Sequence, residues 1–247
     1  MAHGIEVLEI ADARDCLHPV VLGGKTGYAL VDTGFPGMMG PLEAALRASG
    51  CALADIGQIV LTHQDLDHIG GVNGIRELAP RVQIWAHVDD APFMSGLQKP
   101  LKLASDEADY EAASPGRKRF IDEARSGYAA SVFEVDHLLN AGDELVWDVV
   151  GPVRVLHAPG HTPGHIMLYA EHSRTLIPGD GLVVADGRLI GPLPQFAEDL
   201  TRAYASLEQL LSLPIRTVVA YHGGVFQGDI HGALRGVIEA FQGTAAL

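Results

Sequence analysis

The chain has 247 residues, 47% of them hydrophobic, which is enough for a large core in one large domain or two small ones. With 17 basic and 31 acidic residues its net charge is −14, which argues against nucleic acid or an anionic membrane as the main partner. The two cysteines form no CxxC pair, the first residues lack the basic start and apolar stretch of a signal peptide, and no apolar run could cross a bilayer, so we expect a cytoplasmic protein.

The first part of the chain reads as short strands separated by turns and helices. Residues 5–10 alternate apolar and acidic side chains, as a half-buried strand does. Strands alternating with helices are typical of an α/β protein. In chain order we expect strands at 5–10, 19–22 and 28–31, a helix at 41–49, a strand at 56–61, a helix at 72–78 and a strand at 82–86.

The segment at about 88–137 interrupts this rhythm. It is richer in charge, carries three prolines and has helical stretches but no obvious strand. We interpret it as a helical insertion over one face, which either contacts substrate or only supports the fold. Its apolar side chains would accept an acyl chain or anchor the segment, and they are Phe93, Met94, Leu97, Leu101, Leu103 and Phe120.

From Gly142 onward the pattern of short strands separated by turns resumes. The two halves therefore look alike in outline, and no linker or low-complexity tract separates them, so we expect one domain over residues 1–247. The expected elements are strands at 153–157, 166–170 and 175–177, a helix at 200–211, a strand at 215–220 and a closing helix at 232–241.

The strand at 56–61 leads directly into the motif THQDLDHIGG at 62–71. Four of its side chains, within six positions, are suited to bind a metal ion. Imidazole and carboxylate together suit first-row divalent ions. Burying such groups without partners would cost several kcal/mol, which argues against a purely structural purpose. These four residues are His63, Asp65, Asp67 and His68.

Three later strands also lead into a candidate ligand. His161 lies in APGHTPGH at 158–165, Asp180 in PGDG at 178–181, and His222 in YHGG at 221–224. Glycines flank each candidate, which fits a backbone that bends tightly around a small centre. Each of these three motifs alone is weak, but together with the first motif and in this order they predict a metal centre.

The ordered motifs resemble the metallo-β-lactamase superfamily, over essentially the whole chain outside the insertion. The family pattern is HxHxDH, then a histidine in a GHTPGH-like turn, then an aspartate and a late histidine. The resemblance implies a four-layered αββα sandwich with the metals at the edge between the two sheets. It also implies two divalent ions as cofactors, zinc first, with manganese or iron as alternatives.

The resemblance implies a role for each matched residue. Asp32 would accept a hydrogen bond from a ligand histidine, and His157 and His165 would pack beside the ligands or support them. Asp67 would also be catalytic, orienting the nucleophile and passing a proton. The implied ligands are His63, Asp65 and His161 for the first metal, Asp67, His68 and His222 for the second, and Asp180 as a bridge.

One position departs from the family pattern, because Asp65 stands where a histidine is usual. The additional negative charge should make the metals acidify bound water less and should favour manganese or iron relative to zinc. Aspartate is also shorter than histidine, so the alternative is that Asp65 reaches the metal only through a water, and the first site would then be weak or empty.

The activity implied is that of a metal-dependent hydrolase, in which a bridging hydroxide attacks an ester-type bond of a small molecule. Family members that hydrolyse β-lactams generally lack the aspartate matched by Asp180, so a thioester or lactone is expected. The alternatives are a flavodiiron-like di-iron redox protein with a separate partner, and a phosphodiesterase of the same fold. A homodimer is common among relatives.

Overall fold

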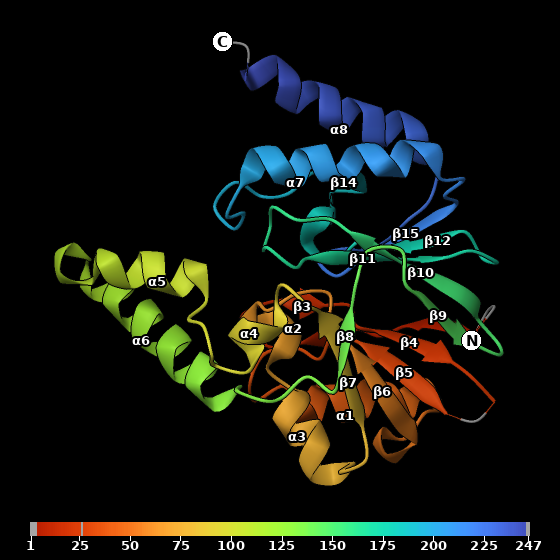
Figure 1. Cartoon of the computed structure of the whole chain (residues 1–247), viewed down its shortest axis with the longest axis horizontal. Coiled ribbons are helices and arrows are strands. Elements are labelled where there is room, and N and C mark those ends of the chain that lie inside the picture. Colours follow the sequence, from red (N-terminus) through yellow and green to blue (C-terminus); the bar gives the residue numbers. More distant parts are fainter. Residues whose placement is uncertain (1–3, 26, 246–247) are drawn as a thin grey trace.

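Two sheets stacked face to face form the centre of the protein, and helices cover the outer face of each (Figure 1). The computed structural model describes residues 4–25 and 27–245. The layers run helix, sheet, sheet, helix, so the predicted αββα sandwich is confirmed. Within the described residues no helix combines the length and hydrophobicity needed to cross a membrane.

The first sheet has six strands in the order β1-β4-β5-β6-β7-β8. β1, β4 and β5 are antiparallel, whereas β5 to β8 run parallel. Helices α1 (Met39–Ala48) and α3 (Val72–Leu78) cover its outer face (Figure 1). The strands are β1 (Ile5–Val7), β4 (Val20–Gly23), β5 (Tyr28–Val31), β6 (Ile56–Val60), β7 (Gln83–His87) and β8 (His137–Leu139).

The second sheet also has six strands, in the order β16-β15-β12-β11-β10-β9. Only β12 and β15 pair in parallel. Helices α7 (Leu200–Leu207) and α8 (Ile230–Ala245) lie over its outer face. The strands are β9 (Glu144–Trp147), β10 (Gly151–His157), β11 (Ile166–Ala170), β12 (Thr175–Ile177), β15 (Thr217–Ala220) and β16 (Gly224–Phe226).

Three apolar clusters correspond to the three interfaces between these layers. In β11, Ile166 and Leu168 belong to the cluster between the sheets, whereas Met167 and Tyr169 belong to the cluster under α7 and α8. Alternate side chains of a strand point to opposite faces, so a strand covered on both faces needs an unbroken apolar run. This explains the sequence IMLYA at 166–170, which is buried throughout.

Two predicted elements are divided in the structure. The strand expected at 5–10 is two strands, because β1 pairs with β4 whereas β2 (Ile10–Ala11) pairs with β3 (Cys16–Leu17). The helix expected at 200–211 ends as an α-helix at Leu207 and continues as the 3-10 turn η4 (Glu208–Ser212). The strands expected at 19–22 and 28–31 correspond to β4 and β5, which pair antiparallel, although residue 26 between them lies outside the described residues.

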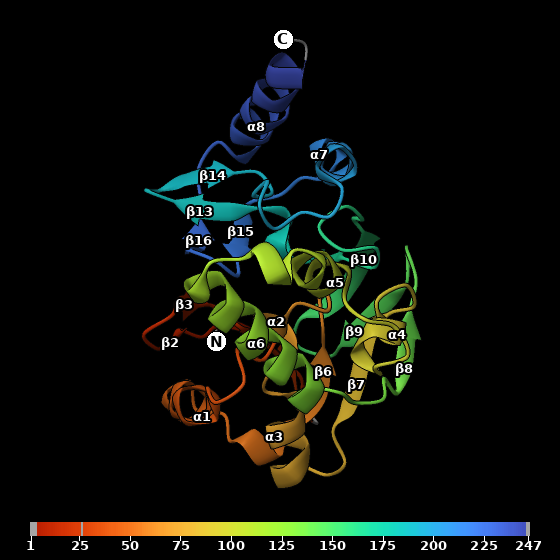
Figure 2. The same cartoon turned by 90° about the vertical axis from the view of Figure 1, so that its left-hand side faces the viewer.

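The chain between β7 and β8 forms three helices that lie outside the sandwich. Figure 2 shows α5 and α6 in front of the level where the two sheets meet. The side chain of Ser114 accepts a hydrogen bond from the backbone N of Arg117 and so caps α6. The single-domain organisation and the extent of the insertion remain predictions. The helices are α4 (Ala91–Met94), α5 (Leu101–Ala108) and α6 (Pro115–Ala130), with η2 (Tyr110–Ala112) between the last two.

Candidate metal centre

The structure brings all seven predicted ligand residues together at one edge of the sandwich. The loop after β6 carries His63 and Asp65 and leads into the short helix α2 (Leu66–Ile69), which holds Asp67 and His68. The second sheet supplies the other three, which follow the ends of strands β10, β12 and β15. Because each ligand follows a strand end, the sheets fix its position. The residues from the second sheet are His161, Asp180 (in η3, Gly179–Gly181) and His222.

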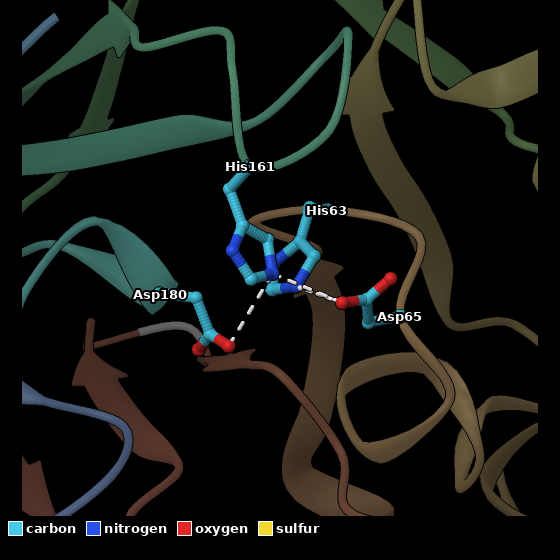
Figure 3. Close-up of side chains that lie close together, drawn as sticks. All are labelled: His63, Asp65, His161 and Asp180. Carbon is cyan, nitrogen blue, oxygen red and sulfur yellow. Dashed lines mark hydrogen bonds and ion pairs between the residues drawn. The ribbon is translucent and has the colours of Figure 1, made fainter. Parts of the chain in front are cut away.

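A first cluster consists of His63, Asp65, His161 and Asp180 (Figure 3). The Oδ2 atom of Asp65 lies 3.3 Å from Nε2 of His63 and 2.9 Å from Nε2 of His161. The Oδ2 atom of Asp180 lies 3.4 Å from Nε2 of His161. These four residues converge through nitrogen and oxygen atoms, as ligands of one divalent ion do.

A second cluster consists of Asp67, His68 and His222. The Oδ2 atom of Asp67 lies 3.3 Å from Nε2 of His222 and 3.6 Å from Nε2 of His68. The other oxygen of Asp180, Oδ1, lies 3.1 Å from Nε2 of His68 and 3.5 Å from Nε2 of His222. Asp180 therefore directs one carboxylate oxygen to each cluster, which suits a bridging ligand.

Several buried atoms at the centre lack the hydrogen bonds that burial ordinarily requires. Nε2 of His63, Nε2 of His68 and Oδ1 of Asp180 have no hydrogen-bond partner among the described residues. Burial opposes protonation of His68, but Asp180, Asp32 and Asp67 outweigh it and hold the pKa of His68 well above its ordinary value. A proton there supplies positive charge that a metal ion could supply instead, so the residues fit divalent cations.

Carboxylates behind the second cluster hold its two imidazoles. Nδ1 of His68 donates to Oδ2 of Asp32 at 2.9 Å, and Asp32 also accepts from the backbone N and the hydroxyl of Thr62. Nδ1 of His222 lies 3.1 Å from Oδ2 of Asp15. A hydrogen bond at Nδ1 leaves the Nε2 lone pair free for a metal. The expected hydrogen bond, in which Asp32 accepts from a ligand histidine, is thus present, whereas the contact between His222 and Asp15 was not expected.

Asp90 is a buried residue of the centre that the sequence analysis missed. It accepts hydrogen bonds from the backbone N of Gln64 (3.0 Å), the hydroxyl of Thr162 (2.7 Å) and the backbone N of Gly164 (2.6 Å). It therefore links the loop that carries His63 to the turn that carries His161. A signal existed, because Asp90 follows the strand predicted at 82–86 as the ligands follow theirs.

Lys102, in α5, is the second missed residue of the centre. Its Nζ contacts Oδ2 of Asp65 and lies 3.0 Å from Nε2 of His161. Burial opposes ionisation of Asp65, but Lys102 and the neighbouring histidines outweigh it and hold the pKa of Asp65 well below its ordinary value. Nothing in the sequence pointed to this lysine, because its contact depends on how the insertion folds back.

The two histidines that flank His161 have supporting contacts. Nε2 of His165 accepts from the backbone N of Asp180 at 3.1 Å, and its Nδ1 donates to the backbone O of Ala158 at 3.2 Å. Burial lowers the pKa of His165 to about 3, so the ring stays neutral and holds the Asp180 loop. His157 stacks on another imidazole and hydrogen-bonds a carbonyl, so it packs beside the site.

The apolar residues of the insertion divide into two groups. Three of them anchor the segment, since they are nearly buried, and three are exposed and free to contact a substrate. Only half of the six apolar side chains singled out in the sequence are therefore exposed enough to contact an acyl chain. The anchoring residues are Phe93, Met94 and Leu103, and the exposed ones are Leu97, Leu101 and Phe120.

Comparisons with known proteins agree with this architecture. The family model described as the metallo-beta-lactamase superfamily matches residues 18–222. The chain is 26% identical to the probable metallo-hydrolase YflN of Bacillus subtilis over 79% of this chain and 75% of that protein. It is 34% identical to a hydroxyacylglutathione hydrolase of Alkalilimnicola ehrlichii, over 77% of this chain but about half, 54%, of that protein.

Solved structures share the fold at lower sequence identity. A metallo-beta-lactamase family protein from Thermus thermophilus superposes with a TM-score of 0.73 at 24% identity, covering 97% of this chain and 80% of that one. A subclass B3 metallo-beta-lactamase of Bradyrhizobium japonicum gives a TM-score of 0.66 at 22% identity, covering 98% and 91%. At these identities the likeness shows the fold alone.

Proposed function

Because this chain belongs to the metallo-beta-lactamase superfamily, we propose that it is a hydrolase that uses two divalent metal ions to cleave an ester-type bond of a small molecule. His63, Asp65 and His161 would hold the first ion, and Asp180 would bridge it to the second. The remaining three ligands of the motifs would hold the second ion. Zinc is the first expectation for both, with manganese or iron as alternatives.

One observation carries this proposal. Asp180 directs Oδ2 to the first cluster and Oδ1 to the second, and the histidine atoms beside it, Nε2 of His63 and Nε2 of His68, lack hydrogen-bond partners within the described part of the chain. Buried polar atoms without partners are costly. Two cations, one on each side of Asp180, would satisfy them together.

Metal ions bound there would polarise the substrate carbonyl and make hydroxide available near neutral pH. The residues of the chain would orient and move protons around that chemistry. Asp67 would accept the proton of the attacking water and return it to the leaving group. The hydroxyl of Tyr221 donates to the backbone O of Asp67 at 2.6 Å and itself accepts from the backbone N of Gly34 at 3.0 Å, so it holds this aspartate in place.

The substrate that we propose is a thioester or a lactone. Support comes from the relatives named hydroxyacylglutathione hydrolase, one of them 34% identical, and from the aspartate at position 180. The exposed side chains of Leu97, Leu101 and Phe120 on the insertion would contact the acyl part.

Elemental analysis and a substrate panel test the proposal. Protein expressed with zinc, manganese and iron all available should contain about two equivalents of metal per chain. It should hydrolyse an S-acylglutathione or an acyl lactone faster than a phosphodiester or a β-lactam. Two equivalents of iron without hydrolysis would favour the redox alternative, and protein that binds no metal would refute the proposal.

A further inference from the structure

The first cluster differs from the second in that it already contains a cation of the protein itself. Nζ of Lys102 contacts Oδ2 of Asp65 and lies 3.0 Å from Nε2 of His161. These two atoms are the ones that would face the first metal. The second cluster has no comparable contact with a lysine or arginine in the described parts of the chain.

The contact matters because the acceptor atoms cannot serve two cations at once. A neutral imidazole has one unprotonated nitrogen with one in-plane lone pair, so Nε2 of His161 can bind a metal or accept from an ammonium, but not both. A divalent ion beside the ammonium would also be repelled strongly at this partly buried position. Metal and Lys102 must therefore exclude one another.

The departure from the family motif makes this competition effective. The carboxylate of Asp65 attracts an ammonium, whereas the usual neutral histidine at this position would not. The ammonium end of Lys102 is only partly exposed, with a side-chain accessibility of 23%, so water does not screen the pair fully. In the ion pair of Asp65 and Lys102, the ammonium thus supplies a positive charge at the first cluster.

We propose that the ammonium of Lys102 occupies the first cation position in the metal-free protein, so that the second cluster binds metal first and a first-site metal must displace Lys102. This inference rests on the proposed metal centre. Because Lys102 belongs to α5, occupancy of the first site is then linked to the position of the insertion that also carries the exposed apolar residues.

Binding of Co²⁺ to the metal-free full-length protein tests the inference. Affinities come from competition with a chromophoric chelator, and the cobalt absorption spectrum reports coordination. The parent should bind in two steps, with the first-site step weaker. Lys102→Met, which keeps the side-chain length but removes the charge, should strengthen that step roughly tenfold or more, because a hydrogen-bonded charge no longer competes. In the His222→Ala variant the same titration should show a weaker second-cluster step, which assigns each binding step to its cluster.

Two variants serve as controls. Lys99→Met removes the same charge from a nearby exposed lysine that pairs with Glu107, so it should behave like the parent. Lys102→Arg keeps the charge and should keep the first-site step weak. A first-site affinity that is unchanged or weaker in Lys102→Met would overturn the inference and leave the hydrolase proposal intact. A parent that binds no cobalt in either step would overturn both.

Discussion

The two halves of the metal centre are supported in opposite ways. In the second cluster, Asp32 and Asp15 lie behind His68 and His222 and direct the Nε2 atoms of both rings inward. In the first cluster, the neighbouring charged group is the ammonium of Lys102, which contacts the ligand atoms of Asp65 and His161 themselves. A carboxylate that accepts a hydrogen bond from Nδ1 of an imidazole orients the ring for a metal, whereas a cation that contacts the ligand atoms opposes metal binding. Similar donor atoms can therefore differ in metal affinity because of their neighbours.

Removal of Asp32 should have the largest effect, because it would leave three buried donors without an acceptor. Asp32→Ala should lower the free energy of unfolding by about 3–5 kcal/mol, measured by urea denaturation. Asp32→Asn should be milder in stability but should weaken metal binding at the second cluster roughly 10–100-fold.

The matched control for Asp32→Asn is Asp186→Asn. Both aspartates have a positive φ, 61° and 49°, but Asp186 is exposed in a turn between β13 (Val183–Ala185) and β14 (Arg188–Ile190). An equal loss of metal affinity in both variants would show that the backbone conformation, and not the hydrogen bond to His68, is responsible.

Exchange of Asp65 for histidine should reduce the difference between the two clusters. In Asp65→His the ammonium of Lys102 loses its carboxylate partner, and imidazole favours zinc over manganese relative to carboxylate. We expect the ratio of zinc to manganese affinity at the first site to rise roughly tenfold or more, measured by competitive binding. If the ratio stays the same, Asp65 is not a ligand.

Loss of the carboxylate behind His222 should have a smaller effect, confined to the second cluster. Asp15 is 45% exposed, so Asp15→Asn should weaken metal binding there by roughly tenfold or less and should leave the first site unchanged. Isothermal titration resolves the two sites. Asp12→Asn, which changes a carboxylate of the same loop that pairs with Arg14, is the control. Weaker binding at both sites would contradict the separation of the clusters.

The smallest expected effect concerns Glu198, beside the first cluster. Burial raises the pKa of Glu198 to about 7, with Lys102 opposing the shift and Asp65 and Asp90 adding to it. The folded state then binds more protons than the unfolded state between about pH 4.5 and pH 7, so this group costs stability as the pH rises through that range.

Glu198→Gln should remove this cost. In metal-free protein, the free energy of unfolding of the variant relative to the parent should rise by about 1 kcal/mol from pH 5 to pH 8. The effect is small because partial exposure of Glu198 screens its charge. Urea denaturation at both pH values measures the difference. A gain that is the same at both pH values would show that the carboxyl group does not titrate in this range.

Local sequence determined much of this protein. The buried strands at 166–170 and 175–177 and the helix at 72–78 have the predicted bounds, because unbroken apolar runs and glycine boundaries are local signals. The split of residues 5–10 into β1 and β2 was not predicted, because it depends on which distant strand each half pairs with. The candidate ligand residues were predicted because each follows a strand end and because the ordered motifs resemble those of the superfamily, and the structure brings these residues together.

Beyond the hydrogen bond to Asp32 that the family resemblance implies, only the tertiary structure decided which side chains contact those residues. Asp15 and Lys102 reach the centre from segments without any metal-binding pattern, and their contacts span 207 and 59 residues. Asp90 follows a predicted strand, but its partner Gly164 lies 74 residues further along the chain. A single charged side chain reads as a surface residue in sequence, since its partner is defined by folding and not by spacing. The sequence therefore identified the candidate metal ligands, and the fold decided which of them are oriented by carboxylates and which are in contact with a lysine.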